Sequence, residues 1–213
     1  MSFQETPHEI KDPVRHTFVA ERVPNEHELH CFYEHLTHKS RVPSKTIVNG
    51  RIVELVCERS AIEPKTIFLD TNKFTFKRTI KQDVPNVQVG QIVSISARLC
   101  YTVHTARAGR QTEVPVDYAG HVKPHLKAIF YAYLERMTGI GEIASGGADM
   151  FIVPEAIPDE MARSKKVWFN GAMSVTLTGK IKDVDACRRL WVQSIGNCRS
   201  YGFGSAVVSL GGA

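Results

Sequence analysis

The order of strand-like and helix-like segments predicts an α+β protein made of two tandem ferredoxin-like domains. Three observations carry this prediction: a first segment with strand periodicity, a helix with one apolar face directly after it, and a further series of helices and strands in the C-terminal half. We expect the two domains to cover residues 1–107 and 108–213.

The first half begins with a strand and a helix. Residues 14–23 alternate apolar and polar side chains, and Asn25 is a suitable N-cap for the helix that follows at 26–40. One face of this helix is apolar (Leu29, Phe32, Tyr33, Leu36), and another is polar (His27, His30, Glu34, His38). The strand-like segments that follow are 45–60, with a hairpin turn at Asn49-Gly50, then 66–80 and 91–103.

The second half repeats this order after a basic, glycine-bearing segment, 104–120, which we interpret as a linker or a protruding loop. A helix with a broad apolar stripe is expected after Pro124, within residues 121–139. A strand at 167–178, a capped helix at 183–194 and a terminal strand at 205–210 complete the expected series.

Composition restricts the class of protein. Of the 213 residues, 43% are hydrophobic and 23% are charged, as in ordinary soluble globular proteins, and no apolar run approaches a membrane span. The polar N-terminal residues 1–13 do not resemble a signal peptide. Five scattered cysteines without a C-x-x-C pair argue against a disulfide framework or a zinc knuckle, and favour the cytoplasm. The formal charge of +5 favours a polyanionic partner such as a nucleic acid.

A glycine-rich stretch near the C-terminus, 194–210, offers a functional clue. Gly196, Gly202 and Gly204 surround Arg199, and an apolar strand follows. A dinucleotide fingerprint or a P-loop needs its glycines between a strand and a helix, whereas these glycines follow a helix and precede a strand. The stretch is either a helix C-cap with a tight turn or a backbone that approaches a phosphate chain. Three glycines around one guanidinium favour the second interpretation.

The run from Gly196 to Gly204 resembles the glycine-rich loop of the CRISPR repeat-processing endoribonucleases, which are double-ferredoxin proteins of the RAMP superfamily. It carries the pattern G-x-x-[KR]-x-x-G-x-G before a hydrophobic terminal strand. Residues 169–179 also resemble the family's strand before the last helix. The family often has a further glycine where this chain has Ser194.

The first helix carries a second resemblance to this family. In the subgroup that serves type I-E systems, this helix has an aromatic-x-aliphatic-His tetrad whose histidine is catalytic. The tetrad here is His27-Glu28-Leu29-His30, so the resemblance implies that His30 is catalytic. His27 stands where the subgroup has an aromatic residue, which leaves the second catalytic role open. A type IV relative fits these residues as well.

RNA can be cut without a metal when its own 2′-OH attacks the adjacent phosphate. This reaction needs a base, an acid for the leaving 5′-oxygen, and positive charge or N–H donors at the phosphorane. Histidine suits the first two roles, so His27 and His30 form a candidate catalytic pair, and Arg199 is a candidate for the third. We expect no metal and no cofactor, because an H-E-x-x-H zinc motif would need histidine where Cys31 stands.

Basic and glycine residues predict an RNA-binding surface. The expected RNA-binding residues are Lys73, Lys77, Arg78, Arg98, Arg107, Arg110, Arg188, Gly196, Arg199, Gly202 and Gly204. Phe74 and Phe76, which alternate with the first of these, either stack on bases or belong to the core. Because repeat hairpins are A-form, we expect the basic side chains to contact phosphates more than base edges.

Together these features favour a cytoplasmic, metal-independent endoribonuclease. The resemblance implies that it binds a CRISPR repeat stem-loop, cleaves precursor crRNA at the 3′ side of the stem and leaves a 2′,3′-cyclic phosphate. It also implies other subunits of a CRISPR effector complex as partners, and no membrane partner is expected. Two alternatives stay open: a non-catalytic RNA-binding subunit of such a complex, and a metalloenzyme with His30, Glu34 and His38 as ligands.

Overall fold

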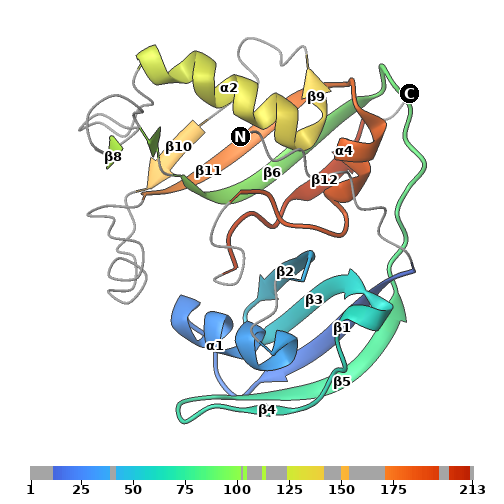
Figure 1. The fold of residues 1–213 in the computed structure, drawn as a ribbon, viewed down its shortest axis with the longest axis vertical. Coiled ribbons are helices and arrows are strands. Elements are labelled where there is room, and N and C mark those ends of the chain that lie inside the picture. The colour runs from blue at the N-terminus through green and yellow to red at the C-terminus, as the bar shows by residue number, and fades with distance from the viewer. Residues whose placement is uncertain are drawn as a thin grey trace.

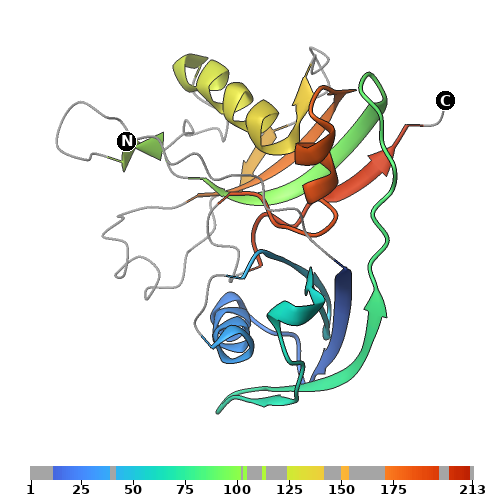
Figure 2. The same cartoon turned by 45° about the vertical axis from the view of Figure 1, so that its right-hand side comes forward.

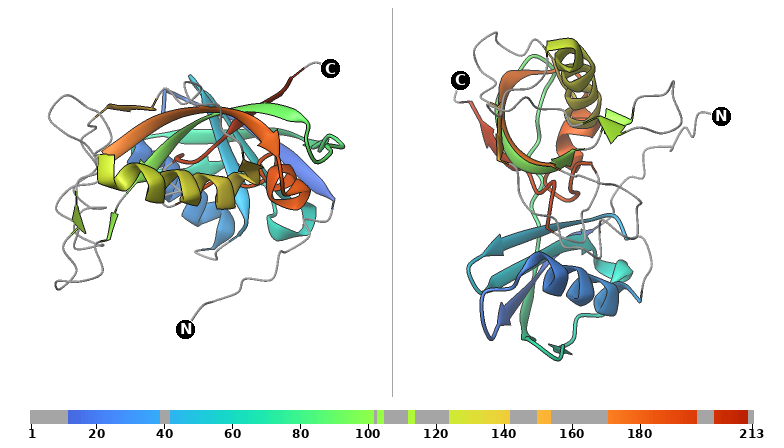
Figure 3. Two further views of the ribbon diagram at one scale, coloured as in Figure 1. Left: turned by 90° about the horizontal axis from the view of Figure 1, so that it is seen from above. Right: turned by 90° about the vertical axis from the view of Figure 1, so that its left-hand side faces the viewer.

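The chain folds into two halves, each of which contains an antiparallel sheet (Figure 1). The halves lie one above the other, and the connection 82–91 runs between them along one side of the molecule (Figures 1 and 3). The structure is a computed structural model, and it describes residues 12–38, 42–101, 103–104, 112–113, 124–141, 150–153, 171–196 and 202–211.

The first sheet has the strand order β2-β3-β1-β5-β4. Its strands are β1 (Pro13–Ala20), β2 (Ser44–Asn49), β3 (Ile52–Glu58), β4 (Ile67–Phe68) and β5 (Lys73–Lys81). Helix α1 (Glu26–Thr37) connects β1 to β2, and β1 lies between β3 and β5, as in a ferredoxin-like domain. A single 3₁₀ turn, η1 (Arg59–Ala61), stands where that topology has its second helix.

The apolar face of α1 packs on this sheet, as its periodicity predicts. Leu29, Phe32 and Leu36 are buried in one cluster with strand residues. The ring of Phe32 meets that of Phe18 on β1 edge-on at 4.8 Å and stacks on that of Phe74 on β5 at 4.4 Å. Phe74 is therefore a core residue and is not available to stack on a base.

The second sheet has the order β10-β11-β6-β12, with β9 paired to β11. Its strands are β6 (Ile92–Tyr101), β9 (Ile140–Gly141), β10 (Met150–Val153), β11 (Gly171–Ile181) and β12 (Val207–Leu210). Helices α2 (Pro124–Thr138) and α4 (Val184–Arg189) follow β6 and β11 respectively. Since β6 lies between β11 and β12, this half repeats the order of the first. The prediction of two tandem ferredoxin-like domains is confirmed.

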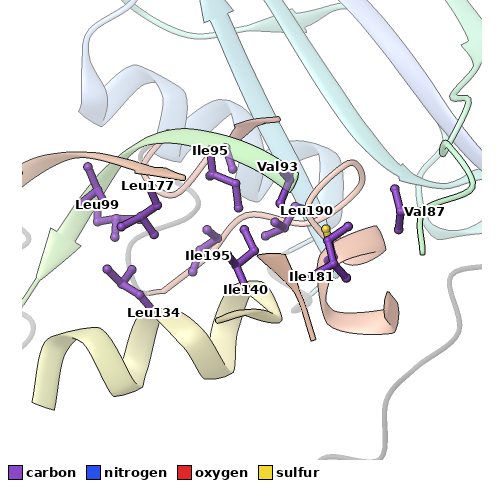
Figure 4. Packing of buried hydrophobic residues seen from close by; sticks show 13 residues of the cluster. Val87, Val93, Ile95, Leu99, Leu134, Ile140, Leu177, Ile181, Leu190 and Ile195 are labelled. Atoms are coloured by element: carbon purple, nitrogen blue, oxygen red, sulfur yellow. The ribbon is translucent and has the colours of Figure 1, made fainter. Parts of the chain in front are cut away.

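The core of the second half lies between its sheet and its helices. Leu99 on β6 and Leu177 on β11 face Leu134 on α2 (Figure 4). Cys187 on α4 is buried in the same cluster, and its burial, followed by the charge of Asp183, raises the pKa of its thiol to about 11. Neither α2 nor any other described helix combines the length and the apolar composition that a membrane span requires.

The expectation that 91–103 completes the first sheet is wrong. β6 is a central strand of the second sheet, where it pairs with β11 and β12. β5 completes the first sheet instead, because it occupies the other side of β1 from β3. Among the described strands, the change from one sheet to the other falls within 82–91, ahead of the limit expected at residue 107.

Several segments differ from their expected bounds. The expected strand 66–80 is divided into β4 and β5 by a turn in which Leu69 N–H donates to Asn72 O at 2.8 Å. The expected helix 183–194 ends at Arg189 and continues as turns. Of the expected loop 104–120, the structure describes only parts of the strand pair β7 (Val103–His104) and β8 (Thr112–Glu113).

Candidate functional site

The start of α1 is fixed by a reciprocal capping box. The side chain of Asn25 accepts from Glu28 N–H at 2.9 Å, and the side chain of Glu28 accepts from Asn25 N–H at 3.1 Å. The two hydrogen bonds define where the first turn begins, and therefore where His27 and His30 lie along the helix.

Glu28 also holds this helix end to the turn between β4 and β5. The residue is 1% exposed, and its carboxylate accepts hydrogen bonds from Arg22, from Thr71 at 2.6 Å and from Asn72 at 3.2 Å. Burial raises the pKa of Glu28, but the hydrogen bonds and the charge of Arg22 outweigh burial and hold the pKa below its usual value. This anchor was not predicted from the sequence, although an Asn followed three positions later by Glu is a capping signal.

His27 and His30 lie on the outer face of α1, one turn apart. His27 is exposed, and its Nε2 is 3.6 Å from Cys31 Sγ. The side chain of His30 is 24% exposed, and its Nε2 is 3.4 Å from Glu34 Oε1. Both imidazoles are therefore accessible and next to a polar group at helical spacing, which suits side chains that exchange protons with a bound substrate.

The glycine-rich loop, by which we mean residues 194–204, needs its glycines for its own fold. Gly196, Gly202 and Gly204 all have positive φ, at 75°, 87° and 79°. A Cβ on Gly204 would lie 1.9 Å from Ile195 O. The loop closes there, because Ile195 N–H donates to Gly204 O at 2.8 Å and Gly204 N–H donates to Arg98 O at 2.7 Å.

The glycine-rich loop meets α1 beside His30. A Cβ on Gly202 would lie 3.2 Å from Leu29 Cδ1, so the loop backbone packs against the residue that precedes His30. Figure 2 shows the described ends of the glycine-rich loop extending toward the first half of the molecule. Helix and loop are far apart in sequence, and the contact places the loop backbone against the neighbour in sequence of the predicted catalytic histidine.

Arg98 on β6 joins the same site. Its guanidinium lies 3.4 Å from the carboxylate of Glu26 in the first turn of α1 and 4.7 Å from the ring centre of Phe203 in the loop. Arg98 was predicted as an RNA-binding residue, but neither of these two contacts was predicted. Glu26 and Arg98 are 72 positions apart, and no local pattern relates them.

Other predicted RNA-binding residues lie elsewhere. Lys73, Lys77 and Arg78 are exposed on β5, on the opposite side of β1 from β2 and β3. Lys73 Nζ lies 5.1 Å from the ring centre of Phe68. Arg188 is exposed on α4. Arg107, Arg110 and Arg199 lie outside the residues that the structure describes.

The alternative of a metal site on α1 requires three ligands in reach of one ion. Within the described part of the chain, no three His, Cys, Asp or Glu side chains gather in this way. His30 and Glu34 are neighbours, as helical spacing requires.

By sequence, neither a protein-family model nor a curated protein matches the chain. By structure, it is similar to the CRISPR endoribonuclease Cse3 bound to a 19-nucleotide RNA, with 14% identity, a TM-score of 0.56, and coverage of 93% of this chain and 100% of the other. Thermus thermophilus Cse3 bound to an RNA representing a pre-cleavage complex gives 14% identity, a TM-score of 0.57 and the same coverage. A chain of a CRISPR RNA-guided surveillance complex gives 16% identity, a TM-score of 0.50, and coverage of 92% and 99%.

These likenesses extend over nearly the whole of both chains. The protein therefore has the double ferredoxin-like fold of the CRISPR endoribonucleases, and the resemblance that the sequence suggested is confirmed at the level of fold.

Proposed function

We propose that this protein is a metal-independent endoribonuclease that binds the stem-loops of CRISPR repeats and cleaves precursor crRNA. The observation that carries the proposal is the meeting of α1 with the glycine-rich loop, where Gly202 packs on Leu29 next to His30. The fold shared with Cse3 chains that were solved with RNA supports it. A fold alone hosts many functions, so the assignment depends on the site.

The proposed reaction uses the substrate's own nucleophile. One imidazole of the pair His27 and His30 accepts the proton of the 2′-OH as its oxygen attacks the adjacent phosphorus, and the other donates a proton to the 5′-oxygen as the P–O5′ bond breaks. The products are a 2′,3′-cyclic phosphate and a 5′-OH. Arg98 and Arg199 supply positive charge for the phosphorane.

We further propose that the protein stays on its product and joins a CRISPR effector complex in the cytoplasm. The similar chain from an RNA-guided surveillance complex supports this assignment. The net charge of +5 is in keeping with prolonged binding to RNA.

The test is cleavage of an end-labelled repeat hairpin in EDTA by wild type and by His30→Ala. We expect wild type to cut once, and we expect His30→Ala to lose about 100-fold or more in single-turnover rate, as for loss of one general acid or base. Digestion of the product with a cyclic phosphodiesterase identifies its end. His35→Ala is the matched control, because His35 is an exposed histidine on the same helix.

The outcomes separate the proposal from its alternatives. Full cutting by His30→Ala contradicts the role of His30. If wild type binds the hairpin tightly but does not cut it, the result favours a non-catalytic RNA-binding subunit. The presence of His27, where the type I-E subgroup has an aromatic residue, would agree with that outcome. Cutting that stops in EDTA and returns with zinc favours the metalloenzyme.

A further inference from the structure

Strand β2 contacts both ends of the glycine-rich loop. It is an edge strand of the first sheet and pairs only with β3 among the described strands. Ser194 N–H donates to Ser44 O at 2.9 Å, and the hydroxyl of Ser205 donates to Thr46 O. The hydroxyls of Ser194 and Ser205 are 3.2 Å apart. The base of the loop is thus closed on the backbone of a strand from the other half of the molecule.

Lys45, between these two β2 residues, reaches into the same base. Its side chain is 7% exposed, and its ammonium donates to Leu190 O at 2.9 Å and to Ala206 O. Leu190 precedes the loop and Ala206 follows it. One ammonium group therefore binds the chain where it enters the loop and where it leaves it.

A buried ammonium is unfavourable unless its protons are bound, and hydrogen bonds from a charged donor are stronger than neutral ones. On the side of the second half, carbonyl oxygens of Leu190 and Ala206 face the charge. On the side of the first sheet, the nearby charged group is Arg15 on β1, which is paired with Glu54 at 3.1 Å. Without the ammonium, two buried carbonyl oxygens would lose their donor.

We propose that Lys45 is a positioning residue for the RNA site: it closes the base of the glycine-rich loop and so keeps Gly202 against α1 beside His30. The inference rests on the proposed function for its consequence in RNA cleavage, but its structural part concerns the free protein. In this role Lys45 acts through the position of the loop and does not contact a reacting atom.

Hydrogen exchange in the free protein tests the structural part. The reporters are the amides of Ser194, Ile195 and Gly204, which close the loop. In Lys45→Met we expect their exchange to rise about tenfold or more, as for loss of a charge-assisted hydrogen bond, while the amides of β1 and β3 stay protected. Lys65→Met is the control, because Lys65 is exposed between η1 and β4. Loop exchange equal to wild type in Lys45→Met overturns the proposal.

A second variant covers the case in which Lys45→Met does not fold. Ser205→Ala removes the contacts of the Ser205 hydroxyl with Thr46 O and with the Ser194 hydroxyl, and it should raise exchange at the same three amides by a smaller factor, with the core unchanged. If exchange in this variant rises equally over both sheets, or does not rise at all, the result contradicts the proposal that these contacts close the base of the loop.

Single-turnover cleavage of the repeat hairpin tests the consequence for function. We expect Lys45→Met to weaken RNA binding and also to lower the rate at saturating RNA, because the loop no longer keeps its position against Leu29 of α1. A normal rate at saturation in a variant with fast loop exchange overturns the positioning role. If wild type neither binds nor cuts the hairpin, the proposed function fails, and the exchange experiment still decides whether Lys45 closes the loop.

Discussion

His16 on β1 is a buried histidine outside the candidate site, with 2% of its surface exposed. Its Nδ1 is 2.8 Å from Thr79 Oγ1, and its Nε2 is buried without a hydrogen-bond partner in the part of the chain that the structure describes. Burial lowers the pKa of His16 below 6.5, and the charge of Arg59 lowers it further. The folded state therefore disfavours the imidazolium that an unfolded chain would form.

We predict that His16 makes the protein sensitive to acid. Because its pKa is lower in the folded state, the unfolded chain binds more protons as pH falls below about 6.5, and the free energy of unfolding falls by up to about 1.4 kcal/mol per pH unit. His16→Gln should remove this part of the pH dependence. Urea unfolding at pH 7.5 and 5.5 measures it, with the exposed His35→Gln as control. An equal loss of stability in wild type and His16→Gln would contradict the prediction.

The glycine-rich loop illustrates how one element serves two purposes. Its glycines have positive φ and lie against Ile195, Leu29 and Tyr133, so the fold explains their identity without a ligand. That backbone also meets α1, where Gly202 lies against Leu29. Backbone that is held in one conformation before binding, as at Gly202 and Gly204, loses less conformational entropy when it contacts a phosphate chain.

We predict that Gly204→Ala destabilises the protein far more than Gly90→Ala. Both glycines have positive φ, at 79° and 86°, but a Cβ on Gly204 would overlap Ile195 O, whereas nothing lies within 4 Å of a Cβ on Gly90. We expect the free energy of unfolding to fall by about 1 kcal/mol in Gly90→Ala, from backbone strain alone, and by about 3 kcal/mol in Gly204→Ala. Urea unfolding compares them. If the two variants lose similar amounts of free energy of unfolding, the base of the loop can move to make room for a side chain.

Polar contacts between the two halves involve β2 and the first turn of α1. Lys45, Ser44 and Thr46 all form hydrogen bonds across it, and Glu26 and Arg98 form an ion pair across it. Glu26 and Arg98 are both partly exposed, so this pair contributes little energy by itself. The ammonium of Lys45, in contrast, belongs to a buried residue and donates across the interface to Leu190 O and Ala206 O.

Lys45 leads to a prediction about alkaline pH. Burial, followed by the charge of Arg15, lowers the pKa of Lys45 from 10.5 to about 8. Between about pH 8 and pH 10.5, Lys45 keeps its proton in the unfolded chain but has released it in the folded chain. As pH increases through this range, the free energy of unfolding of wild type should therefore rise relative to that of Lys45→Met. The slope approaches about 1.4 kcal/mol per pH unit. Guanidinium unfolding of both proteins at pH 7.5, 8.5 and 9.5 measures it, and a constant difference between them would show that Lys45 is solvated.

Much of the fold could be predicted because its signals are local. The period of α1, with Leu29 and Phe32 on one face, places the helix on the sheet and His30 on its outer face. The division of 66–80 into two strands was not predicted, although the turn that causes it, closed by Leu69 N–H and Asn72 O, contains Asp70 and Asn72, which are residue types that favour turns. β6 was assigned to the wrong half because strand periodicity does not say which strand is the neighbour.

The sequence by itself determined the repeated strand and helix order, the outer position of His27 and His30 on α1, and the backbone freedom of the glycine-rich loop. These follow from periodicity and from the conformations that each residue type allows. Only the tertiary structure decided that Gly202 meets Leu29, that Arg98 joins Glu26 to Phe203, and that Lys45 closes the loop. Such contacts depend on how two sheets pack together, and burial and hydrogen bonding between distant segments settle them only once the chain has folded.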